Sequence, residues 1–251
     1  MLMTITELRA KIKSGRPTVG AWLQLPSPDV AEIIGRSGYD WAAVDMEHGA
    51  MSRNVLPDLF RALECGSTLP FVRVAEAGRE NIKAALDSGA RGLILPMIET
   101  AEQLELAMAW AHYPPKGCRG VGYCRANEHG RRFDEYLAES ADIFMVAQIE
   151  HTKAVDNLED ILALPGLDAI MVGPYDLSGS MGITGQLNHP AMAEAMNRIA
   201  ALAKHADVPM GTHVVVPDPA ELNARIREGY LFLAYGIDAV FMNMAAPCPK
   251  Y

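Results

Sequence analysis

The chain has 251 residues, of which 50% are hydrophobic and 21% are charged, a composition typical of one globular domain with a sizeable core. This composition excludes a largely disordered chain, and the formal net charge of −9 disfavours nucleic acid or an anionic membrane as a partner, so we expect a small-molecule substrate. The N-terminus turns polar too early for a signal peptide and the cysteines lack metal-ligand spacing, so we expect a reducing, cytoplasmic setting.

Short apolar runs alternate with stretches of helical periodicity, which predicts parallel strands joined by crossover helices. Strands are expected at 18–23, 41–45, 71–74, 92–96, 143–148, 169–173, 210–214 and 231–236. Helices are expected at 29–38, 53–65, 79–88, 101–112, 152–164, 190–205 and 219–228. This order predicts an α/β fold, a single (β/α)8 TIM barrel over residues 1–251.

Two segments depart from the regular pattern. Segment 113–132 is long and rich in Gly and Arg, and we expect it to form a loop over the active face. Segment 239–251 contains Pro247 and Pro249, so the closing C-terminal helix is expected to be short or absent. The flank left uncovered predicts contact with another subunit, and therefore a homo-oligomer.

Two acidic residues follow apolar runs at the ends of neighbouring strands. Glu150 comes after the fifth predicted strand, and Asp176 comes after the sixth. Because adjacent strands lie about 4.8 Å apart and their carboxyl ends meet at the mouth of a barrel, these two acids can bind one hard divalent cation. The alternative is that both acids only stabilise the first turns of helices.

Arg73 lies within an otherwise apolar strand, where a guanidinium needs an anionic partner. That partner is either a carboxylate or enolate oxygen of the substrate, or a buried ion pair with Glu47 or Asp45. His48 sits beside the same two acids, which can orient its ring, and it is a candidate general base. His151 and His213 are candidates for supporting roles.

The turn after the sixth strand is a candidate anion site. Backbone amides between Gly173 and Asp176 can bind a substrate carboxylate, although Pro174 has no amide hydrogen to donate. A Schiff-base mechanism is disfavoured because every lysine falls in a predicted helix, a loop or a terminus. Metal-assisted enolisation is therefore preferred.

Several short strings of residues together resemble the HpcH/HpaI family of class II pyruvate aldolases, which are metal-dependent (β/α)8 enzymes. The resemblance covers nearly the whole chain and rests on segments 38–41, 45–49, 70–73, 87–90, 113–120, 148–150 and 173–178. It implies that Glu150 and Asp176 bind Mg²⁺, Mn²⁺ or Co²⁺, and that pyruvate chelates this ion. The further roles it implies are enolate stabilisation by Arg73, acid/base work by His48 and Asp45, substrate contact by Gln148, and a reach of Asp87 into a neighbouring subunit's site.

The chain departs from the family pattern in two places. His151 stands where many members have Thr, and it either tunes the metal site or caps a helix. Family members assemble as hexamers through a long C-terminal helix exchanged between subunits, and that helix is expected to be short here. The resemblance therefore implies a hexamer that the C-terminus puts in question.

The predicted reaction is the reversible cleavage of a 4-hydroxy-2-oxo acid to pyruvate and an aldehyde by a carbon-carbon lyase. The substrate is of the 2-keto-3-deoxy sugar acid or hydroxy-oxo-dioate type. Basic residues of the 113–132 segment suggest an anionic or polyhydroxylated aldehyde, unless they only form a solvated surface: Arg119, Arg125, Arg131 and Arg132. The alternatives are a lyase of the citramalyl-CoA kind and a noncatalytic keto-acid-binding barrel.

Overall fold

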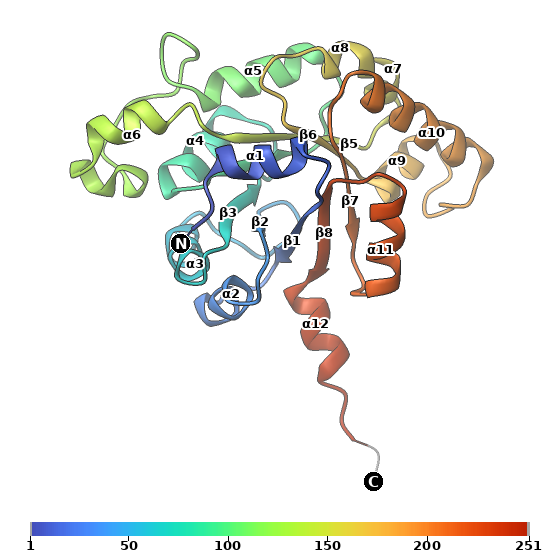
Figure 1. Ribbon diagram of the computed structural model, residues 1–251, viewed down its shortest axis with the longest axis horizontal. Coiled ribbons are helices and arrows are strands. Elements are labelled where there is room, and N and C mark those ends of the chain that lie inside the picture. The colour runs from blue at the N-terminus through green and yellow to red at the C-terminus, as the bar shows by residue number, and fades with distance from the viewer. Residues whose placement is uncertain (1, 250–251) are drawn as a thin grey trace.

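Eight parallel strands form a closed barrel in the computed structural model, which describes residues 2–249 (Figure 1). Each strand pairs with the next along the chain, and the last pairs with the first. The strands are β1 (Thr18–Leu23), β2 (Trp41–Asp45), β3 (Leu69–Arg73), β4 (Gly92–Leu95), β5 (Phe144–Ile149), β6 (Ala169–Val172), β7 (Met210–Val214) and β8 (Phe232–Ile237). The predicted (β/α)8 barrel is confirmed.

Helices surround the barrel on its outer side. They are α1 (Ile5–Lys13), α2 (Pro28–Gly35), α3 (Leu56–Cys65), α4 (Arg79–Ser88), α5 (Ala101–Ala111), α6 (Phe133–Glu139), α7 (Thr152–Asp156), α8 (Leu158–Leu162), α9 (Pro174–Ser180), α10 (Pro190–His205), α11 (Pro219–Arg227) and α12 (Asp238–Ala245). The turn glycines Gly38, Gly89 and Gly229 have φ values of 86°, 106° and 95°. Only glycine adopts this left-handed conformation without strain, so the predicted helix-ending turns are confirmed.

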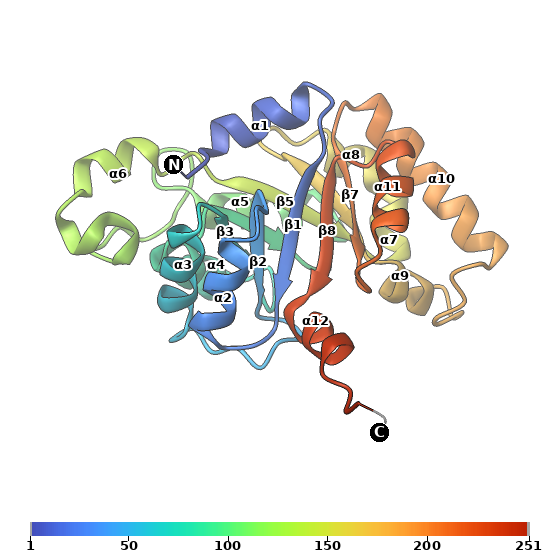
Figure 2. The same cartoon turned by 60° about the horizontal axis from the view of Figure 1, so that its bottom comes forward.

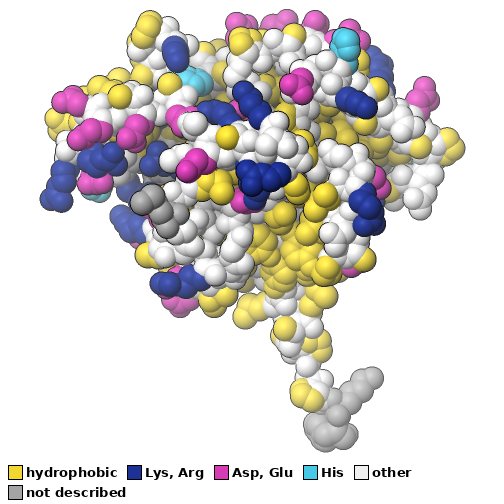
Figure 3. Space-filling view, viewed as in Figure 1, with side chains coloured by type: hydrophobic (Ala, Val, Ile, Leu, Met, Phe, Trp, Pro, Cys, Tyr) yellow, Lys and Arg dark blue, Asp and Glu magenta, His cyan; other side chains and the backbone are white. Residues whose placement is uncertain are grey.

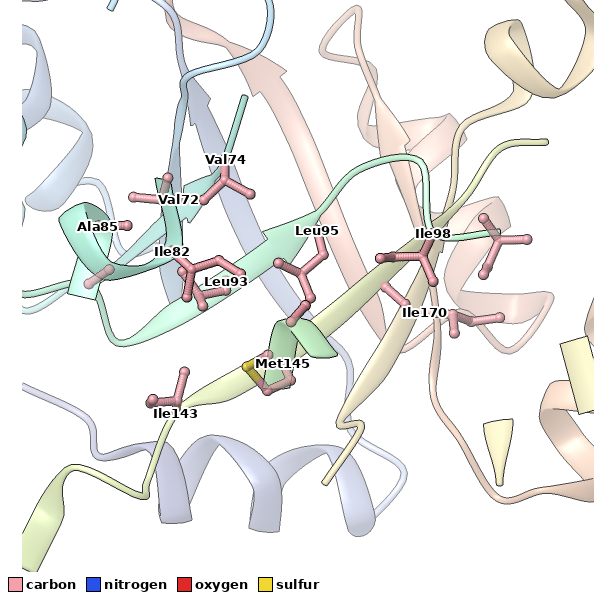
Figure 4. Close-up of a cluster of buried hydrophobic side chains, with 14 of the residues drawn as sticks. Val72, Val74, Ile82, Ala85, Leu93, Leu95, Ile98, Ile143, Met145 and Ile170 are labelled. Carbon is pink, nitrogen blue, oxygen red and sulfur yellow. The ribbon is translucent and has the colours of Figure 1, made fainter. Parts of the chain in front are cut away.

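Stacked aromatic rings fill the inside of the barrel. The rings of Trp41 and Phe232 are nearly parallel, with centroids 4.3 Å apart, and Phe71 and Phe144 pack against Phe232. A second apolar layer lies between the strands and the surrounding helices, and Figure 4 shows part of it, where α4 packs on β3, β4 and β5. Burial on both faces explains why these strands are apolar throughout rather than alternating.

Helix α1 covers the N-terminal end of the barrel (Figure 2). Its buried residues Ile5, Leu8 and Ile12 belong to the same apolar cluster as the aromatic rings inside the barrel. Thr4 and Glu7 form a capping box at the start of the helix, which satisfies backbone amides that have no partner within the helix. The helix therefore closes the end of the barrel opposite to the site described below.

Segment 113–132 does not cover the active face, so that prediction was wrong. It connects α5 to β5 and includes a 3-10 helix, η1 (Arg125–Gly130), which projects with α6 from one side of the molecule (Figure 1). Arg125 donates to the Ser88 carbonyl at the end of α4 and bonds to Glu64 near the end of α3. A connection that leads from a helix into the next strand lies at the N-terminal end of the barrel, opposite to the strand-to-helix loops.

Helix α12 is the short closing helix that the sequence predicts. It ends before Pro247, it packs on β1 and β8, and it points away from the barrel (Figure 1). Met242 and Met244 on this helix are exposed. The homo-oligomer that the sequence suggests stays a prediction. Over residues 2–249, the structure has no helix with the length and apolarity needed to cross a membrane.

Candidate active site

Arg73 and Asp45 form a buried ion pair at the C-terminal end of the barrel. The two residues are register partners on β3 and β2, and Arg73 donates from Nε to Oδ1 at 2.9 Å and from Nη2 to Oδ2 at 2.7 Å. Arg73 Nη1 also lies 3.0 Å from Glu47 Oε2. The buried ion pair expected as one alternative is therefore present, with both acids. Burial disfavours charge on Asp45, but the bonds from Arg73 and the Gln24 amide outweigh it and lower the Asp45 pKa.

An aromatic stack supports Arg73 from inside the barrel. The Arg73 Cζ atom lies 5.0 Å from the centre of the Trp22 ring, and the His213 ring packs on the same indole at 4.9 Å. Burial lowers the pKa of His213 to about 4, so its ring is neutral near pH 7. His213 Nε2 lies 3.1 Å from the Gly236 carbonyl, so in the neutral ring Nε2 carries the proton. His213 thus supports the site, while the role of Trp22 had no polar signal in the sequence.

Glu150 is a buried carboxylate held by two donors. The Met97 amide donates to its Oε1 at 2.8 Å, and the Gln148 side-chain amide donates to its Oε2. Met97 presents this amide from a left-handed backbone, with φ 52°. Burial raises the pKa of Glu150, and the negative charges of Glu47 and Asp176 raise it further. The three carboxylates therefore lie close enough to repel one another.

Gly173 leaves room for the Glu150 carboxylate. A Cβ atom at this position would collide with Glu150 Oε2, so the backbone can pass here only as glycine. The Gly173 amide itself donates to the Ile149 carbonyl at 3.2 Å. A contribution of Gly173 and Pro174 to substrate binding stays a prediction, and it rests on the close approach of their backbone.

The donor atoms of Glu150 and Asp176 suit a hard divalent cation that keeps water or substrate oxygens as its other ligands. Within residues 2–249, no cluster of three or more His, Cys, Asp or Glu residues is arranged to bind a metal. Gln148 Oε1 is buried and has no hydrogen-bond partner in the same described part of the chain. Asp176 also lies in the first turn of α9, as the helix-end alternative held, whereas Glu150 precedes the N-cap of α7. The residues fit a cation of this kind.

His48 lies exposed at the mouth of the barrel. Asp45 Oδ1 accepts the backbone amides of Glu47 and His48, at 3.1 and 3.2 Å. Asp45 therefore holds the loop that carries His48, rather than the imidazole ring that the sequence led us to expect it to orient. The catalytic role of His48 stays a prediction.

Two further candidates lie elsewhere or have a local role. Asp87 ends α4 at the N-terminal end of the barrel, where Lys83 Nζ and Arg119 Nη2 donate to it at 2.6 and 2.7 Å. It does not join Glu150 within this chain, and its role in a neighbouring subunit stays a prediction. His151 Nδ1 accepts the Lys153 amide at 3.1 Å, so His151 caps α7.

Comparison with known proteins agrees with this fold and site. The sequence profile described as HpcH/HpaI aldolase/citrate lyase matches residues 18–245. A 4-hydroxy-2-oxovalerate aldolase of Novosphingobium aromaticivorans is 37% identical, covering 95% of this chain and 91% of its own. A 2-keto-3-deoxy-L-rhamnonate aldolase of Klebsiella pneumoniae is 36% identical, covering 92% and 86%. The crystal structure of an HpcH/HpaI aldolase/citrate lyase family protein from Burkholderia cenocepacia is 34% identical, with a TM-score of 0.89 and 95% of each chain covered. The chain belongs to the HpcH/HpaI aldolase/citrate lyase family.

Proposed function

We propose that the protein is a class II aldolase that reversibly cleaves a 4-hydroxy-2-oxo acid to pyruvate and an aldehyde. One observation carries this proposal: the buried Glu150 carboxylate, fixed by Met97 and Gln148, lies in one cluster with Asp176 and with the Glu47 that contacts Arg73. Such a cluster places sites for a cation and for a developing oxyanion side by side. The aldolases among the relatives support the same reaction class.

In this proposal Glu150 and Asp176 hold Mg²⁺, Mn²⁺ or Co²⁺. When bound, such a cation withdraws electrons from the keto group of the substrate. Gln148 contacts the substrate beside Glu150, and its free Oε1 is available for that contact. Arg73 supplies a fixed positive charge for the oxygen that becomes negative, because Asp45 prevents its guanidinium from turning away.

The chain's own residues move the protons. His48 accepts the proton of the C4 hydroxyl, the C3–C4 bond breaks, and its electron pair passes into the pyruvate enolate while the aldehyde leaves. A proton returned to C3 then gives pyruvate. His48 suits this step because it lies at the open mouth, on a loop held by Asp45.

Exchange of the pyruvate methyl protons for deuterium, followed by NMR, tests the proposal. We expect exchange with Mg²⁺ or Mn²⁺ and none after EDTA treatment. We expect Glu150→Gln to slow exchange by about 100-fold or more. Glu99→Gln is the matched control, because Glu99 lies on the same face but pairs with Lys153, and it should stay within about threefold of the wild type.

Full exchange in EDTA-treated protein would contradict the metal-dependent mechanism. A noncatalytic keto-acid-binding barrel would show no exchange under any of these conditions. Faster cleavage of a CoA thioester than of the free hydroxy keto acid would instead favour a lyase of the citramalyl-CoA kind.

A further inference from the structure

We infer that the aldehyde part of the substrate carries no charge. This inference rests on the proposed function and adds a substrate class to it. Its basis is the set of side chains that the strand-to-helix loops place around the mouth of the barrel. These loops hold acids and apolar groups, with almost no free cation.

The strand-to-helix loops contain a single Lys or Arg. These loops are the segments 24–27, 46–55, 74–78, 96–100, 150–151, 173 and 215–218. Their one basic residue of this kind is Arg53, whose Nη2 lies 2.9 Å from Glu80 Oε1. Segment 181–189, which leads from α9 to α10, has none. The same loops carry the acids Glu47, Glu76, Glu99, Glu150 and Asp218.

The other cationic groups near the mouth are already engaged. Arg73 contacts Asp45 and Glu47 and serves the keto-acid part of the substrate. Lys153, in the first turn of α7, lies 3.2 Å from Glu99. The ring of His213 is packed on Trp22 and donates to a backbone carbonyl, and its lowered pKa keeps it neutral. A carboxylate at the far end of the aldehyde would find no cation of this chain to pair with.

Exposed apolar side chains follow three of the strands, and we call them the apolar rim. The rim consists of Met97, Tyr175, Val215 and Val216, which are 44%, 63%, 39% and 58% exposed. The rim adjoins the catalytic groups, because the Met97 amide binds Glu150 and Tyr175 precedes Asp176. Figure 3 shows apolar side chains gathered beside α11 and along α12 on this side of the molecule. The rim offers an alkyl chain contact and offers a carboxylate only the loss of its water.

The arginines that suggested an anionic aldehyde lie at the other end of the barrel. Arg119 is buried against Asp87 and Tyr136, and Arg125 pairs with Glu64. Arg125 and Arg131 also line a cavity of about 470 Å³ between α3, η1 and α6, at the N-terminal ends of the strands. The suggestion of an anionic aldehyde from these residues is therefore not supported by their position in this chain.

The test compares two four-carbon aldehydes in the addition to pyruvate: butanal, which is neutral, and succinic semialdehyde, which carries a carboxylate. We expect kcat/KM to be at least about tenfold higher for butanal. Val216→Arg, which adds a cation to the rim, should shift this ratio at least about fivefold toward succinic semialdehyde. Ile33→Arg is the control, because Ile33 is exposed on α2 away from the rim, and it should leave the ratio unchanged.

A wild-type preference for succinic semialdehyde would overturn the inference, including the case in which a second copy of the chain supplies the cation. That outcome would leave the proposed function intact as long as pyruvate exchanges its methyl protons. Absence of both aldol addition and proton exchange would instead remove the proposed function itself. An equal shift of the ratio by Val216→Arg and Ile33→Arg would show that the rim does not contact the aldehyde.

Discussion

Asp45 and Arg73 face each other across two adjacent strands and exchange two hydrogen bonds, of 2.9 and 2.7 Å, as register partners. The pair fixes the guanidinium in one plane, above the indole of Trp22. Both groups are buried, so neither has water to replace a lost partner. The same carboxylate also holds the loop of His48, which couples two groups of the proposed mechanism.

Asp45→Asn should therefore lower both activity and stability. The variant leaves the buried guanidinium without its main counter-charge, which we expect to lower the free energy of unfolding by about 3 kcal/mol. We expect kcat to fall by about 100-fold, because Arg73 loses its fixed orientation. Urea unfolding and the pyruvate-release assay measure the two effects.

Asp40→Asn is the matched control for this variant. Asp40 accepts bonds from Lys11 and from the Val19 amide at the opposite end of the barrel. Its loss should lower stability while kcat per folded molecule stays unchanged. An unchanged kcat in Asp45→Asn as well would show that the ion pair has only a structural role.

The barrel could be predicted because its strands are buried on both faces, which leaves apolar runs that end at polar residues. The ends of β1, β2 and β7 were predicted to the residue. Predictions were poorer where a segment depends on distant contacts. Helix α1 was missed because its three buried residues are spread over a short polar segment and are buried only by the barrel floor.

The candidate site was predictable in its acids but not in its supporting groups. Glu150 and Asp176 stood out because each follows an apolar run, whereas Met97 and Gly173 act through the backbone, which leaves no chemical signature in a sequence. Trp22 looks like any core residue of β1 until Arg73 is placed above it. The position of segment 113–132 depends on counting which end of the barrel a connection occupies, and an error of one element reverses it.

Gly173→Ala should disable the proposed metal site with little effect on the rest of the fold. Its Cβ would push the Glu150 carboxylate out of the position held by Met97 and Gln148. We expect Mn²⁺ affinity, measured by calorimetry or electron paramagnetic resonance, to fall at least about tenfold. Gly179→Ala on α9 is the control, since its Cβ would meet only Thr184 Oγ1 at 3.7 Å and alanine favours a helix. Equal Mn²⁺ affinity in both variants would contradict this account of Gly173.

Asp87→Asn should destabilise the fold, because Arg119 is buried and depends on this carboxylate for charge balance. We expect a loss of about 3 kcal/mol in the free energy of unfolding. Lys83→Gln removes the other partner of Asp87, which is about half exposed, and should cost less than about 1 kcal/mol.

The same Asp87 variant tests the role across subunits that the family resemblance implies. If Asp87 reaches a neighbouring site, kcat per folded molecule falls in Asp87→Asn but not in Lys83→Gln. A free energy of unfolding that is unchanged in Asp87→Asn would show that Arg119 does not need this partner.

His213 should make the protein less stable as the pH falls. The pKa of His213 is about 4 in the folded chain and about 6.5 when unfolded, so the unfolded chain binds the proton more readily. The resulting stability is present above pH 6.5 and is lost as the pH falls toward 4, by about 2 kcal/mol between pH 7 and pH 5. His213→Phe keeps an aromatic ring on Trp22 but cannot be protonated, so its free energy of unfolding should fall less over this interval. Parallel urea titrations at the two pH values separate His213 from the carboxylates, whose contributions are common to both proteins. Equal losses in the two proteins would mean that His213 is not the group that responds.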